Sequence, residues 1–175
     1  SSAEEAGQEN GQAAAAYYLA VLYNESPLKD VKKALDYLAH FNTSLSDVTE
    51  YRDSALYLHG KLLMQMGRKQ DAYNKLLRLE KDYPDSVDTV NLALAGFFFY
   101  YENNMPGLAS YYARKGLALP MGKQYVEKNT DILFQFGNAF AESGMSEFVD
   151  DAKKIFEPLW KENGSLPRTQ KIAVA

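Results

Sequence analysis

The sequence lacks cysteine altogether, which excludes disulfide bonds, cysteine-ligated zinc or iron–sulfur sites and cysteine nucleophiles. It also lacks long apolar runs, since no stretch approaches the roughly 18 residues that a membrane-spanning helix needs. Positive charge is scarce: 19 Lys and Arg face 23 Asp and Glu, for a net charge of -4. Phosphate backbones and anionic lipid surfaces require clustered cations. We therefore expect no nucleic-acid partner and no direct insertion into a membrane.

Catalytic motifs are missing as well. The HExxH, GxGxxG, P-loop and GxSxG spacings do not occur, and His40 and His59 are the two histidines. His59 falls at an expected helix-pairing position, which favours a packed histidine over a ligand or a base. Asp150 and Asp151 lie near an expected helix start, where carboxylates interact favourably with the helix dipole. We expect no enzymatic activity, no cofactor and no metal site.

What the sequence does contain is helical periodicity from residue 12 onward. No segment shows the period-two alternation of a half-buried strand, so an all-α fold without a sheet is predicted. Residues 1–11 are polar and acidic and are expected to form a flexible leader ahead of a single domain spanning 12–175. Helices are expected at 12–24, 28–41, 50–66, 69–83, 87–102, 106–118, 123–143, 147–161 and 167–174.

Turn-forming residues mark where these helices begin and end. Ser26 followed by Pro27 predicts an N-cap with proline at the first helical position, and Asp85 is placed to cap a later helix. Gly67 and Gly144 are expected to stop helices. Two prolines, Pro84 and Pro120, are expected to end the second helix of a pair.

The segment from Asp53 to Ser86 shows a spaced pattern of small and large residues. Small residues at Gly60 and Ala72 would let two paired helices approach closely, while leucines fill the space toward neighbouring pairs. The pattern resembles the tetratricopeptide repeat. Residues 87–120 and 130–163 match it with longer turns, and the first pair matches it least. The positions that carry the resemblance are Leu56, Gly60, Leu63, Gly67, Ala72, Leu76, Leu79 and Pro84.

The resemblance implies that about four antiparallel helix pairs, followed by a C-terminal cap, stack as a right-handed α-solenoid with a concave groove. In this family the first helix of each pair lines the groove. Family members that grip a terminal carboxylate use several Lys, Asn and Arg side chains, and Lys61 alone does not complete such a clamp. Transferring the groove positions gives the partner-binding candidates Tyr17, Tyr57, Lys61, Phe97, Tyr100, Tyr101, Phe134 and Asn138.

Five consecutive aromatic residues, Phe97 to Tyr101, point all round a helix at steps of about 100°. One interpretation is a central helix that is packed on nearly every side. The other is that Phe97, Tyr100 and Tyr101 stay partly exposed and anchor a partner, because interfaces favour large, rigid rings.

These features favour a protein-interaction scaffold that binds a peptide or a partner helix in an aromatic groove. A self-assembling module and a solute- or small-molecule-binding protein of the bacterial envelope are the alternatives. Residues 83–86, Tyr-Pro-Asp-Ser, resemble the inter-repeat joint of bacterial envelope lipoproteins, and the Ser-Ser start resembles residues that follow a lipidated cysteine. This likeness implies a periplasmic or outer-membrane-anchored protein with an upstream lipid anchor, and a cytoplasmic location is the alternative.

Overall fold

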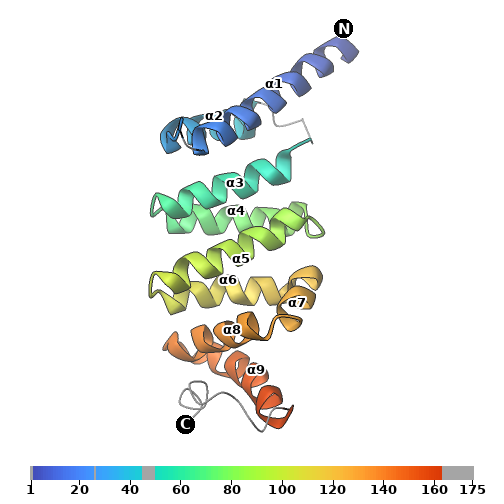
Figure 1. Ribbon diagram of the computed structural model, residues 1–175. Helices are drawn as coiled ribbons and strands as arrows, with labels where there is room; N and C mark the ends of the chain where they lie inside the picture. Colours follow the sequence, from blue (N-terminus) through green and yellow to red (C-terminus); the bar gives the residue numbers. More distant parts are fainter. Residues whose placement is uncertain (1, 26, 45–49, 163–175) are drawn as a thin grey trace. The chain divides into compact units, whose positions relative to one another are not determined.

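The computed structural model describes residues 2–25, 27–44 and 50–162, and within these ranges the chain contains helices and no strand (Figure 1). The prediction of an all-α fold is therefore confirmed for the described residues, whereas the helix expected at 167–174 lies outside them. The elements are α1 (Ser2–Asn24), α2 (Val31–Ser44), α3 (Arg52–Gln65), α4 (Lys69–Asp82), α5 (Val87–Glu102), α6 (Pro106–Ala118), α7 (Pro120–Glu127), α8 (Thr130–Glu142), the 3-10 turn η1 (Ser146–Phe148) and α9 (Val149–Glu162).

The chain divides into two compact units, residues 1–92 (unit 1) and residues 93–175 (unit 2), and the division falls inside α5. In unit 1, α1 packs on α2, α2 on α3 and α3 on α4. In unit 2, α6 packs on α7 and on α8, and α8 packs on α9. Within each unit, these helices that follow one another in the sequence are thus neighbours in space, as short turns predict.

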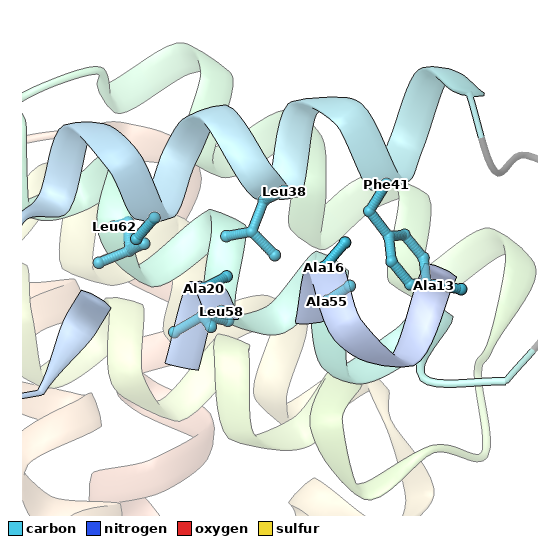
Figure 2. Close-up of a cluster of buried hydrophobic side chains, with 9 residues drawn as sticks. Ala13, Ala16, Ala20, Leu38, Phe41, Ala55, Leu58 and Leu62 are labelled. Atoms are coloured by element: carbon cyan, nitrogen blue, oxygen red, sulfur yellow. The ribbon is translucent and has the colours of Figure 1, made fainter. Parts of the chain in front are cut away.

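The core of unit 1 is built on a stripe of alanines along α1. Ala13, Ala16 and Ala20 recur at helical spacing and are almost fully buried. Because alanine is small, α2 can approach α1 closely, and larger side chains of α2 and α3 complete the cluster around the stripe (Figure 2). The residues that meet the stripe are Ala34, Leu38 and Phe41 of α2 and Ala55, Leu58 and Leu62 of α3.

The first helix starts earlier than the apolar periodicity predicts. The sequence places its start at residue 12, after a leader, but α1 begins at Ser2. Its first ten residues are rich in Ala, Glu and Gln, which have high helix propensity, so the helix extends N-terminally without burying an apolar face. Where the side chains of residues 5–12 are described, they are exposed.

Left-handed residues end three of the helices. Gly67 has φ 73° after α3, and the amide of Arg68 donates to the carbonyl of Leu63 at 2.9 Å. Gly144 has φ 69° after α8, so both glycine stops are confirmed. Asn104 has φ 55° and occupies the same position after α5, where the sequence analysis assigned no stop.

The helix starts differ from the predicted caps. Ser26 lies outside the described residues, and α2 begins at Val31, where the Asp30 carboxylate accepts a hydrogen bond from the Lys33 amide at 3.0 Å. Ser86, not Asp85, caps α5, since its hydroxyl accepts a hydrogen bond from the Asp88 amide at 3.1 Å. Both cap residues belong to the Ser and Asp types that satisfy free amides at helix starts.

The single helix predicted at 123–143 is two helices. Pro120 opens α7 at its first turn instead of ending the preceding helix, and α7 stops at Glu127. A Cβ placed on Gly122 would lie 2.3 Å from the carbonyl oxygen of Gly116, so α7 packs directly on the backbone of α6. The Asn129 side chain then donates to the Tyr125 carbonyl at 2.6 Å, and this competing hydrogen bond accompanies the break before α8.

The small residues of the repeat-like pattern lie at close helix contacts, but not all with the expected partner. A Cβ on Gly60 would meet Leu92 of α5 at 2.7 Å, so the close neighbour comes from the next pair and not from α4. In unit 2, a Cβ on Gly96 would meet the Tyr112 ring of α6 at 2.0 Å. One on Gly137 would meet Phe156 of α9 at 2.7 Å, so these two glycines contact the helix that the pattern predicts.

Candidate functional site

The aromatic run of α5 is a packed helix face. Phe97 and Tyr100 are 0% and 1% exposed, so the prediction that they remain partly exposed is wrong. The Phe97 ring packs on Phe136 with centroids 4.2 Å apart, and Tyr100 packs on Tyr112 at 5.4 Å. Tyr101 is half-buried and stacks on Phe97 at 5.3 Å. The interpretation of a helix packed on nearly every side therefore applies, because helices on several sides must cover consecutive rings.

Three other pairs of side chains involve the predicted partner-binding residues. Tyr57 and Lys61 are one turn apart on α3, both half-buried, and the Lys61 ammonium lies 5.2 Å from the centre of the Tyr57 ring. In unit 2, half-buried Phe134 packs edge-on against Phe156 at 5.4 Å. Asn138, also half-buried, follows Phe134 by one turn on the same face of α8.

Tyr17 belongs to a group of three rings, Tyr17, Tyr18 and Tyr51, which we call the tyrosine cluster. Tyr17 and Tyr51 are stacked, with centroids 5.3 Å apart and an interplanar angle of 15°. Tyr18 meets both at steep angles, 61° and 65°, with centroid distances of 5.4 and 5.6 Å. At these separations the rings fill the space between one another. The cluster is therefore a solid platform and not an open cage.

One side of the platform is exposed. The Tyr18 side chain is 52% exposed, and Leu22, one turn later on α1, is 51% exposed. Residues four apart lie side by side on a helix, so these two large side chains form one continuous aromatic and aliphatic surface. Tyr17 behind them is half-buried against the core of unit 1.

Tyr51 holds a strained backbone at the base of this surface. Its φ of 61° and ψ of 7° are left-handed, a conformation that costs a non-glycine residue roughly 1–2 kcal/mol. Stacking on Tyr17 offsets part of that cost. Hydrogen bonds to Tyr18 and to Glu50, with the negative charge of Glu50, raise the pKa of Tyr51 to about 12. The Tyr51 hydroxyl thus stays protonated near neutral pH.

Two carboxylates lie next to the cluster, where the N-termini of α3 and α5 meet in unit 1. The Ser86 hydroxyl donates to Asp53 at 2.7 Å, and the Ser54 hydroxyl donates to Asp88 at 2.6 Å. Neither carboxylate forms an ion pair with a Lys or Arg of the described ranges. Burial raises the pKa of Tyr17 first, a hydrogen bond with Ser54 partly offsets this, and the charges of Asp88 and Asp53 raise it further. The cluster therefore lies in a negative local field.

His59 is a packed, neutral histidine, as its helix-pairing position suggests. It is 9% exposed, and its Nδ1 lies 3.3 Å from the side-chain amide nitrogen of Asn42, so Nδ1 accepts that hydrogen bond. Burial, together with the positive charges of Lys75 and Arg68, lowers the pKa of His59 to about 4. An unprotonated, enclosed ring stabilises the contact between α2 and α3.

In unit 2, Arg114 of α6 joins several polar groups of neighbouring elements. It donates to the Asp151 carboxylate at 2.7 Å and to Glu147 at 3.1 Å, and its guanidinium lies 4.1 Å from the centre of the Phe148 ring. Asp151 therefore contributes to a clamp between α6 and α9, beyond the helix-dipole role that its place in the sequence suggests. These ion pairs and the ring contact hold α6 against η1 and α9, and the Arg114 charge is paired with two carboxylates.

The part of the chain that the structure describes holds no group of three or more His, Asp or Glu side chains placed to bind a metal ion. None of its helices combines the length and apolarity needed to cross a bilayer.

Tyr18 and Tyr51 are not among the partner-binding residues that the sequence predicts. The Tyr17-Tyr18 doublet is visible in the sequence, but nothing local predicts that Tyr51, more than 30 residues away, stacks on it. Of the three rings, the family pattern transfers Tyr17, since Tyr18 and Tyr51 do not fall at its groove positions. No protein-family model, curated protein or solved structure matches the chain.

Proposed function

We propose that this chain is a protein-interaction module that binds a peptide or a partner helix through the tyrosine cluster and Leu22. We also propose that its helix pairs follow the tetratricopeptide scheme within each unit. Glycines at close helix contacts support that scheme, namely Gly96 against Tyr112 and Gly137 against Phe156. No catalytic role belongs to the proposal, and the envelope location stays a prediction from the sequence.

The observation that carries this proposal is the half-exposed ring of Tyr18 on a platform that is already packed. A large ring left in water forfeits roughly 1.5–3 kcal/mol of burial free energy, of which Tyr18 forfeits about half. A partner that covers it recovers this term. Tyr17 and Tyr51 already hold the ring in place, so little side-chain entropy is lost on binding.

A selection with a phage-displayed library of random 12-residue peptides on the immobilised full chain tests the proposal. Peptides that emerge are synthesised, and their dissociation constants are measured for the wild type, Tyr18→Ala and Tyr125→Ala. Tyr125 of α7 is the matched control, because it is also a helical tyrosine and is 48% exposed. We expect Tyr18→Ala to weaken binding by about tenfold or more, as for a typical interface anchor, and Tyr125→Ala to leave it unchanged.

Two results would overturn the proposal. One is a set of selected peptides that bind the Tyr18→Ala variant as tightly as the wild type. The other is an equal loss of binding in both variants, which would indicate generic attraction to exposed rings instead of a site at the cluster.

A further inference from the structure

We infer that the tyrosine cluster recognises a cationic side chain, Lys or Arg, that the partner places over the exposed ring of Tyr18. This inference rests on the proposed function and adds the chemical nature of the partner. Three observations lead to it: the negative charge beside the rings, the half-exposed Tyr18, and lysine–tyrosine contacts that unit 1 already makes elsewhere.

The charge around the cluster is negative. Glu50 directly precedes Tyr51 in the sequence, and the negative charges of Asp88 and Asp53 raise the pKa of Tyr17. Each of these two aspartates accepts a serine hydroxyl, which satisfies lone pairs without adding positive charge. Arg52 is the cation in this stretch of sequence, so Glu50, Asp53 and Asp88 leave a net charge of -2 among the four side chains. A partner cation would complement that charge.

The geometry of the rings decides how a cation would be held. An aromatic cage needs rings that are far enough apart to admit the cation between them, and the centroid distances of 5.3 to 5.6 Å leave no such room. Neither neighbour stacks face to face on Tyr18, because both interplanar angles exceed 60°. The cation would therefore lie on the outside of the platform, over the π face of Tyr18, where the ring quadrupole attracts it.

Unit 1 already contains the same chemistry within its own chain. The Lys33 ammonium lies 5.1 Å from the centre of the Tyr23 ring, and that of Lys61 lies 5.2 Å from the Tyr57 ring. Tyr18 has no such cation among the described residues, although its ring is half exposed and carboxylates are near. A lysine or arginine from a partner would supply it, with Leu22 covering the aliphatic part of that side chain.

The sharpest test changes the peptide and leaves the protein intact. The tightest selected peptide is resynthesised with each Lys replaced by norleucine, which keeps the aliphatic stem and removes the charge, and separately by Arg. The lost cation–π contact and the lost, partly screened ion pair together predict about 3- to 30-fold weaker binding when the Lys that contacts Tyr18 is replaced by norleucine. Replacement of the same Lys by Arg should change binding little. If the selected peptides contain no Lys or Arg, or if norleucine binds equally well, the inference is wrong.

A double-mutant cycle that removes the Glu50 charge from the protein and the Lys charge from the peptide tests whether the two charges interact at the cluster. Glu50→Gln should weaken the Lys peptide by about 2- to 5-fold and leave the norleucine peptide unchanged, while the exposed Glu142→Gln in unit 2 serves as the control. Equal effects of Glu50→Gln on both peptides would contradict the inference. The two failures are distinguishable. If Tyr18→Ala weakens binding but the norleucine replacement does not, the proposed function is supported and the inference of a cationic partner is wrong.

Discussion

Two groups of aromatic rings, one in each unit, are packed in opposite ways. Unit 2 concentrates five rings in consecutive positions, and none of them is strongly exposed, with Phe97 and Tyr100 almost fully enclosed. Unit 1 brings together three tyrosines from α1 and the start of α3, and one of them, Tyr18, is left half in water. A dense run must be covered on several sides because its rings point all round the helix. In a small group such as the tyrosine cluster, one ring can pack against the core while another stays exposed to a partner.

The largest expected effect comes from removing a ring of the enclosed run. Phe97→Ala should lower the free energy of unfolding of unit 2 by about 3–5 kcal/mol, because it deletes a buried ring and leaves a cavity beside Phe136. Trp160, the one tryptophan of the sequence, lies in α9 of unit 2, so urea unfolding followed by its fluorescence measures this change. Tyr101→Ala, at a half-buried position, is the control and should lower the free energy of unfolding by less than Phe97→Ala does. A loss below about 1 kcal/mol for Phe97→Ala would contradict the enclosed packing.

Unit 1 should respond to acid through His59. Because the folded pKa of about 4 lies below the ordinary value of about 6.5, the unfolded chain binds the proton more readily. The contribution of the neutral His59 ring to the free energy of unfolding is fully present above pH 6.5 and decreases as the pH falls toward 4. The loss amounts to roughly 2–3 kcal/mol of unfolding free energy at pH 4.5. The imidazolium can no longer accept the Asn42 hydrogen bond.

This pH dependence is measured from urea midpoints followed by far-UV circular dichroism at pH 7 and pH 4.5. His59→Gln keeps a polar side chain and removes the titration, so the difference between the wild type and this variant isolates the histidine from the carboxylates. If both proteins lose the same stability between the two pH values, His59 is not buried in its neutral form.

Alanine substitutions at two glycines of unit 2 distinguish the effect of close packing on stability from that of helix propensity. Gly96→Ala should destabilise by about 1–3 kcal/mol, since its Cβ would lie 2.0 Å from the Tyr112 ring and a packed ring cannot easily move. At Gly116 the nearest atom would be 3.7 Å away, an ordinary contact. Gly116→Ala should therefore stabilise by about 0.5–1 kcal/mol. Thermal unfolding of the two variants checks the sign of each change, and equal signs would contradict this assignment.

Much of the fold was predictable because its signals are local. Helical periodicity predicted most of the helices and their order. Gly67 and Gly144 follow the ends of α3 and α8 as expected, because a left-handed turn favours glycine. The errors also have local causes that the pattern does not contain. Pro120 can start a helix as readily as it can end one, and the Asn129 side chain competes for the carbonyl that a continuous helix would use.

The candidate site was harder to predict because tertiary contacts create it. Tyr17 was selected from the family pattern, but its partner Tyr51 enters the cluster through a left-handed backbone that tyrosine rarely adopts. Phe97 and Tyr100 were selected by the same pattern and are enclosed. Whether a ring at a given helical position is covered depends on which helices lie around it, and a single helix does not contain that information.

The smallest expected effect on stability comes from Tyr18, and it separates the two roles of the rings. Tyr18→Ala removes a ring that is already half in water, so the free energy of unfolding should fall by about 1 kcal/mol or less. Tyr18→Ala should nevertheless weaken peptide binding by about tenfold or more, whereas Phe97→Ala should destabilise unit 2 and leave peptide binding to unit 1 intact. Denaturation followed by circular dichroism, combined with peptide titration of both variants, measures the two properties together. If Tyr18→Ala destabilised the protein as strongly as Phe97→Ala, the exposed ring would be part of the core, and no free energy would remain for a partner to recover by covering it.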